Sequence, residues 1–147
     1  MLSFQREDGI IEGWWGDGNF CRTALMYAFF HTKGTYCVPW RDDLRLSGEE
    51  TEEGLRVHLS AEGPWRGSLY FDPPRHSYFL RMNKDYPRIN AFPEWFTVDA
   101  LQLYEVNGLD SVPSVVLGQQ LIDGLEVKLA ANQGLSLHIR HAPDAIR

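Results

Sequence analysis

The sequence predicts a mainly β protein: an antiparallel β-sandwich of the jelly-roll type with one N-terminal core α-helix. From Asp42 onward, short runs of alternating apolar and polar residues recur about every ten residues, separated by turn-forming residues. Before them, residues 20–30 are apolar on almost every side of a helix. A length of 147 residues suits one domain. We therefore expect a single domain over 1–147, with a Trp-rich turn and packed helix in 1–34, the sandwich in 35–141 and a tail in 142–147.

The predicted helix lies within GWWGDGNFCRTALMYAFFHTKG, residues 13–34. Asp17 or Asn19 can accept hydrogen bonds from the first-turn amides, and Gly34 suits the left-handed position after the last turn. Because only Arg22 and Thr23 interrupt the apolar residues, we expect burial on nearly every face. One sheet covers one side of a helix, so the rest would need a second sheet, a neighbouring chain or helices of a longer protein.

Residues 42–71 are predicted to form three strands of an antiparallel meander. Leu44 and Leu46 begin the first strand, and the acidic segment at 47–54 is predicted as a surface turn. The second strand covers 55–59 and the third 65–71, each with one apolar face.

Two Asp-x-Pro-Arg segments follow, at residues 72–75 and 85–88. Proline withholds a ladder donor, so each segment can end a strand. We predict a strand between them over 77–82, and an aromatic loop over 89–96 that packs on the sheet.

The last third is predicted to consist of short strands near residues 101–105, 115–117, 125–129 and 135–139. Asn107 and Gly108 are a two-residue hairpin signal, and Asp123-Gly124 and Gln133-Gly134 are further turns. The tail is expected to fray.

Composition and spacing argue against several classes of function. The net charge of −6 is unsuited to nucleic acid, which needs clustered basic residues. No run of 18 apolar residues exists, so no membrane span is expected, and the first residues lack a signal-peptide pattern. Cys21 and Cys37 are expected to be buried free thiols. The alternative is a disulfide between them, which would need their Cα atoms within about 7 Å. A zinc site is not expected, because neither has a close Cys or His at ligand spacing. We expect no metal and no cofactor.

Aromatic residues make up 13% of the chain and can serve either a large core or sugar stacking. One candidate sugar subsite lies at the head of the helix, where rings adjoin a carboxylate and a guanidinium: Trp14, Trp15, Asp17, Asn19 and Arg22. In the alternative reading the tryptophans fill the seam between helix and sheet, and Asp17 caps the helix.

A second candidate group mixes charges and rings: Arg75, His76, Tyr78, Arg81, Asp85, Tyr86, Arg88, Glu94 and Trp95. It could form a groove in which His76 and a carboxylate act as acid and base, or a set of ion pairs that fix a loop to the sheet.

Two further groups are expected to be structural. The acidic turn and Asp42 and Asp43 match no calcium loop and are expected to be a solvated charge run. His138 and His141 lie three residues apart, on opposite faces of a strand, which disfavours joint metal binding.

Three blocks of the chain, covering most of residues 9–140, carry a resemblance to a family. The first block is GWWGDGNFCRTALMYAFFHTKG followed by PWRDDLRL. It resembles the last toroid helix and exit segment of some bacterial carbohydrate-active enzymes. The second block is PWRGSLYFDPPRHSYFLRMNKDYPRINAFPEWFTVD. It resembles the β-sandwich that follows such a toroid in six-hairpin-glycosidase-like proteins. The third block, GQQLIDGLEVKLAANQGLSLHI, is similar to the final hairpins of such sandwiches.

The resemblance implies an accessory C-terminal β-sandwich of a glycoside hydrolase or polysaccharide lyase, secreted or periplasmic within a longer protein. Such a domain would support a helical catalytic domain that carries the catalytic acids, and would contact glycan through Trp14, Trp15 and Trp40, with Asp17 and Arg22 bordering the cleft. One alternative is a standalone jelly-roll enzyme with its site at His76, Tyr78 and Arg81. Another is an assembly domain that buries the helix between protomers.

Overall fold

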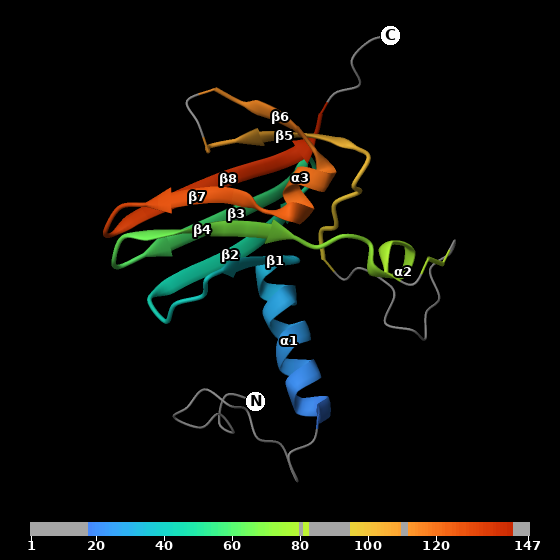
Figure 1. Ribbon diagram of the computed structural model, residues 1–147, viewed down its shortest axis with the longest axis horizontal. Coiled ribbons are helices and arrows are strands. Elements are labelled where there is room, and N and C mark those ends of the chain that lie inside the picture. Colours follow the sequence, from blue (N-terminus) through green and yellow to red (C-terminus); the bar gives the residue numbers. More distant parts are fainter. Residues whose placement is uncertain (1–17, 80, 83–94, 110–111, 143–147) are drawn as a thin grey trace.

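Two antiparallel sheets form the protein, as expected for a mainly β, sandwich-like fold. The computed structural model describes residues 18–79, 81–82, 95–109 and 112–142. The larger sheet has the order β2 (Leu44–Thr51), β3 (Gly54–Ala61), β8 (Gln133–His141), β5 (Leu103–Asn107) and β6 (Ser114–Leu117). The smaller sheet has the order β1 (Thr35–Val38), β4 (Trp65–Phe71) and β7 (Leu125–Leu129) (Figure 1). The fold class predicted from the alternating pattern is confirmed.

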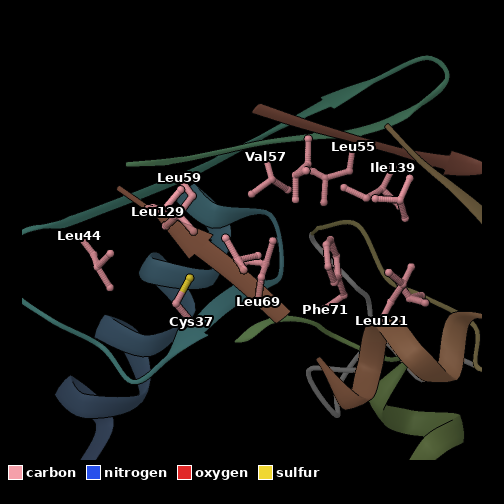
Figure 2. Packing of buried hydrophobic residues seen from close by; sticks show 14 of the residues in the cluster. Cys37, Leu44, Leu55, Val57, Leu59, Leu69, Phe71, Leu121, Leu129 and Ile139 are labelled. Carbon is pink, nitrogen blue, oxygen red and sulfur yellow. The ribbon is translucent and has the colours of Figure 1, made fainter. Parts of the chain in front are cut away.

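The core lies between the inward faces of the two sheets (Figure 2). In the larger sheet, Leu55 and Val57 of β3 pair with Ile139 and Leu137 of β8, and all four are almost fully buried. Leucine, valine and phenylalanine side chains of β4 and β7 cover them from the smaller sheet: Leu69, Phe71, Val127 and Leu129. Alternation along each strand thus separates a dry face from a wet one.

The predicted meander of residues 42–71 is wrong in its third strand. β3 pairs with β2 and β8, whereas β4 belongs to the other sheet. Alternation fixes which side chains of β4 face inward, but a strand can bury the same face beside β3 or opposite it. The turn at residues 62–64 therefore crosses from one sheet to the other.

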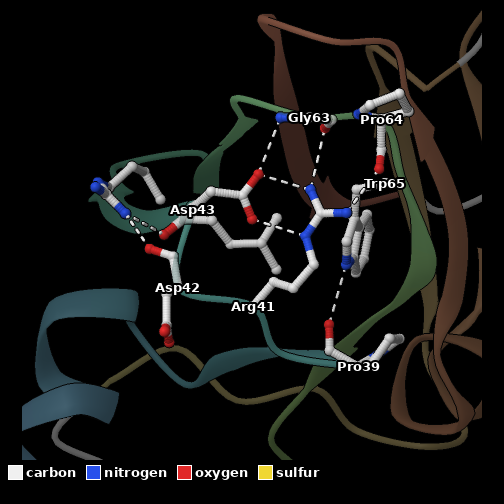
Figure 3. A network of polar contacts seen from close by, with 9 residues as sticks. Pro39, Arg41, Asp42, Asp43, Gly63, Pro64 and Trp65 are labelled. Carbon is white, nitrogen blue, oxygen red and sulfur yellow. Dashed lines mark hydrogen bonds and ion pairs between the residues drawn. The ribbon is translucent and has the colours of Figure 1, made fainter.

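Polar contacts hold this crossover in place (Figure 3). Arg41 donates to both carboxylate oxygens of Asp43, at 2.7 and 2.6 Å, and to the carbonyl oxygens of Gly63 and Pro64. Asp43 also accepts from the amide of Gly63 at 2.9 Å. The hydrogen bonds from Arg41 lower the pKa of Asp43 from 3.8 to about 2. Trp65 Nε1, just beyond the turn, donates to the Pro39 carbonyl at 3.0 Å.

The acidic turn predicted over residues 47–54 is much shorter in the structure. β2 continues to Thr51, which pairs with Gly54, so only residues 52–53 form the turn. The pattern was misleading because Gly48 occupies an inward position without a side chain. A Cβ there would lie 2.5 Å from the Thr32 carbonyl oxygen, so glycine is required where the helix meets the sheet.

Short helices replace two predicted features of the later chain. The strand predicted over 77–82 is wrong: Arg75–Tyr78 form helix α2, after a proline whose carbonyl accepts from the Tyr78 amide at 2.8 Å. The turn predicted at Asp123-Gly124 ends a helix that the pattern did not predict, α3 (Gly118–Asp123). The hairpin predicted at Asn107-Gly108 is confirmed, because β5 pairs antiparallel with β6, but its loop is longer than two residues, since residues 108–113 connect the strands. Of the loop predicted over 89–96, only Trp95 and Phe96 are described.

Helix α1 (Gly18–Thr32) ends where predicted, but it is not buried on nearly every face. Leu25, Tyr27 and Phe30 are 62%, 53% and 48% exposed. The helix projects from the sandwich, and its C-terminal end meets the sheets (Figure 1). The expected burial failed because the described sandwich covers only this end. None of the described helices is long and apolar enough to cross a membrane.

Cys37 is a buried free thiol, as predicted, whereas the side chain of Cys21 is outside the described part of the chain. The tail from residue 143 onward is also outside it.

Candidate functional site

The predicted sugar subsite is only partly within the described residues. Trp14, Trp15 and Asp17 lie outside them, so their arrangement stays a prediction. Arg22 is exposed on α1. Trp40 is in the loop between β1 and β2, and 57% of it is exposed.

Trp40 stands at an open depression of about 1130 Å³ on the larger sheet. It is lined by two cross-strand rows of outward-facing residues and by four leucines of the same strands, Leu44, Leu46, Leu59 and Leu135. Ser47, His58 and Ser136 form one row across β2, β3 and β8. Arg45, Ser60 and Gly134 form the next row. These positions alternate with the inward leucines, so they lie on the outer face of the sheet.

The depression combines an exposed ring with many hydrogen-bonding groups. The serine hydroxyls donate and accept, and His58 adds an exposed imidazole. Arg45 is held by donation to the carbonyl oxygens of Asp42 and Leu44, at 2.7 and 3.0 Å. Nothing lies within 4 Å of a Cβ built on Gly134, so this part of the floor is open. An apolar ring beside such groups is the chemistry that recognises a sugar.

A second, apolar groove of about 390 Å³ lies between α1 and the edge strands β1 and β2. Leu25, Phe29 and Cys37 are among the residues that line it, and Trp40 and Leu46 line both hollows. Burial raises the pKa of the Cys37 thiol to about 12, so this thiol is neutral near pH 7. Arg22 lines neither hollow, so the structure does not bring it to Trp40.

No protein-family model, curated protein or solved structure matches this chain. The resemblance to carbohydrate-active proteins therefore stays a prediction.

The second predicted group lies at the other end of the smaller sheet. Tyr78 is half-exposed in α2 and Arg81 follows it, so neither lines the concave sheet that an enzyme site required. The side chain of His76 and residues 83–94 are outside the described part, and the proposed acid–base pair stays a prediction.

Sequence reasoning missed the buried centre of this region, Asp72. The residue is 5% exposed, and its carboxylate accepts from Arg75 Nε at 3.0 and 2.9 Å and from Trp95 Nε1 at 2.9 Å. The guanidinium of Arg75 also lies over the Phe29 ring, 4.9 Å from its centroid. The available signal was Asp72-Pro73-Pro74-Arg75, a carboxylate and guanidinium three residues apart in a proline turn.

The remaining predicted groups make structural contacts. In the acidic segment, Glu49 lies 3.9 Å from Arg56 and Glu50 lies 3.9 Å from Lys33, all on the surface or partly exposed. Within the described ranges, no three His, Cys, Asp or Glu residues gather where a metal ion would bind.

The two histidines of β8 lie on opposite faces, as predicted. Ile139 between them points into the core. His141 packs on the buried Tyr104, with ring centroids 4.8 Å apart. His138 lies beside Arg56 on the polar face.

Proposed function

We propose that this chain is a non-catalytic accessory β-sandwich of a carbohydrate-active protein, of the glycoside hydrolase or polysaccharide lyase type, and that it binds glycan at the Trp40 depression. The observation that carries the proposal is the exposed Trp40 ring beside serine, histidine and arginine side chains on one sheet face. The ring would stack on the apolar face of a sugar, and the polar row would bond its hydroxyls.

The size of the depression favours a polymer over a small molecule. Its volume of about 1130 Å³ exceeds the roughly 300–1,000 Å³ of small-molecule sites. A chain of sugars can lie across an open sheet face and gain affinity from successive contacts. Helix α1 also fits an accessory role, because a helical catalytic domain would cover its exposed apolar residues.

The proposal is tested by calorimetric titration of a panel of plant and host polysaccharides and their oligosaccharides. We expect at least one to bind, and Trp40→Ala to weaken that binding about tenfold, equivalent to about 1.4 kcal/mol. Leu101→Ala is the control, because Leu101 is an exposed apolar residue, 84% exposed, that lines neither this depression nor the other hollows. Absence of binding to the whole panel, or equal affinities for wild type and Trp40→Ala, would refute the assignment.

A second candidate function, assembly of two copies through α1, is favoured by the exposure of Leu25, Tyr27 and Phe30. Leu25 lies on the side of α1 that faces Tyr36 and Trp40, whereas Tyr27 and Phe30 lie on the opposite side, so a second copy would have to cover the helix on both sides. A fully covered aromatic side chain buries about 150–250 Å². The rings of Tyr27, Phe30, Tyr36 and Trp40 are each about half exposed, so with Leu25 they offer roughly 500 Å² per protomer, and two copies reach on the order of 1,000 Å², the lower bound for a specific interface. Light scattering would then give twice the chain mass, and Phe30→Glu would give the monomer; a monomeric wild type at high concentration excludes it.

A further inference from the structure

A separate hollow of about 370 Å³ lies where the C-terminal part of α1 meets the ends of β1 and β4 and the short helix α2. Its volume falls within the range of small-molecule sites. Half of its lining residues are aromatic, and one carboxylate and one guanidinium join them: Phe29, Tyr36, Phe71, Phe79, Asp72 and Arg75. None of these residues lines the Trp40 depression.

The guanidinium of Arg75 is the chemically active feature of this hollow. Its Nε donates to both oxygens of Asp72, and its plane lies near the Phe29 and Trp95 rings, at 4.9 and 5.9 Å from their centroids. These contacts fix the group, yet 48% of the side chain is exposed. The two terminal nitrogens make no hydrogen bond to any described residue. A guanidinium held in this way can present a fork of donors without losing further side-chain entropy.

The carboxylate of Asp72 is already satisfied. Only 6% of its side chain is exposed, and it accepts from Arg75 and from Trp95 Nε1. A ligand that needs an acceptor would therefore find none free on this residue. The hollow offers donors instead.

Tyr36 supplies a further donor at the same wall. Burial raises the pKa of its hydroxyl, so the group is protonated at neutral pH. The ring is held by stacking on Tyr70, with centroids 4.9 Å apart and planes 9° apart. The complementary ligand is thus an acceptor with an apolar body.

We propose that this hollow binds an organic carboxylate, with its oxygens on the terminal nitrogens of Arg75 and its apolar body against Phe29 and Phe79. Forked guanidinium donors match the two oxygens of a carboxylate. This site rests on its own geometry and does not depend on glycan binding at Trp40. Because Asp72 neutralises the charge of Arg75, binding depends on hydrogen-bond geometry and ring contact more than on net charge.

The test is calorimetric or NMR titration of the full chain with sodium benzoate, and with benzamide as its neutral counterpart. Benzoate is expected to bind at least tenfold more tightly than benzamide. Arg75→Gln is expected to weaken benzoate binding tenfold or more, and Phe79→Ala several-fold. The matched control is Arg66→Gln, since Arg66 is an exposed arginine of β4 that pairs with Glu126 and does not line the hollow.

Phe79→Ala keeps the test decisive if Arg75→Gln does not fold, because Phe79 is mostly exposed. The proposal is overturned if benzoate does not bind the wild type, if benzamide binds equally well, or if Phe79→Ala leaves the benzoate affinity unchanged. A loss in Arg66→Gln equal to the loss in the hollow variants would also overturn it, because it would show a nonspecific charge effect.

Discussion

Replacing Asp72 with alanine should lower the free energy of unfolding much more than the loss of an exposed carboxylate does. The residue joins three segments: its amide donates to the Gly34 carbonyl at 2.9 Å, its own carbonyl accepts from Val98, and its carboxylate holds Trp95. The backbone bonds survive the substitution, so the loss comes from the side chain alone. Hydrogen bonds to a charged group contribute about 1.5–3 kcal/mol each.

Two effects set the magnitude. Trp95 Nε1 would lose its acceptor in a partly buried place, which costs about 1–3 kcal/mol. Arg75 is half-exposed, so water can replace much of its interaction with the carboxylate. The sum is a loss of about 2–4 kcal/mol in the free energy of unfolding.

Urea denaturation monitored by circular dichroism measures this loss, with an unchanged m value as the sign that only stability changed. The matched control is Asp42→Ala, at an exposed carboxylate in the β1–β2 loop, which should shift stability by no more than about 0.5 kcal/mol. If the two variants differ from wild type by the same small amount, the Asp72 cluster does not hold these segments together.

Three further predictions follow from other contacts. Gly48→Ala should lower the free energy of unfolding measured in urea by about 1–3 kcal/mol, because its Cβ would lie 2.5 Å from the helix backbone. Gly134→Ala should be neutral, because a Cβ there meets open space. Equal losses in the two variants would contradict the close approach at Gly48. The pKa of Asp43 falls from 3.8 to about 2 on folding, so its stabilising contribution is present above pH 3.8 and disappears as the pH falls through about 2. Between pH 5 and pH 2, the free energy of unfolding should therefore fall more in the wild type than in Asp43→Asn. Parallel curves for the two proteins would refute this. In a Cys21→Ser background, Cys37 should react with a thiol reagent at pH 8 only after denaturant is added, because burial raises its pKa to about 12; rapid reaction of the folded protein would contradict its burial.

Local sequence pattern predicted the strands well because the period of two reflects a physical difference between faces. Leu55 and Val57 alternate with polar residues in the sequence and are buried in the structure. The end of α1 was likewise predictable, since Gly34 adopts a φ of 81° just after it.

Sheet membership was not predictable from the same pattern. β4 buries one face whether it lies beside β3 or opposite it, and the choice depends on contacts distant in sequence, such as Arg41 with Gly63 and Pro64. The prediction that α1 is buried on nearly every face was wrong for a related reason. Periodicity shows that a surface is apolar but not what covers it.

The candidate sites show the same limit. Trp40 could be singled out by residue type and is indeed exposed, but its neighbours on the sheet, including His58 and Ser136, come from strands far apart in the chain. Asp72 and Trp95 are separated by 23 residues, and only the fold brings them into contact.

The measurement that tests the proposed function most directly combines light scattering with thermal unfolding in the presence of the glycan panel. We predict that one glycan raises the unfolding temperature of the wild type, and that Trp40→Ala abolishes this shift while leaving the mass and the unliganded stability unchanged. A stable dimer that responds to no glycan would contradict sugar binding and identify α1 as the functional surface.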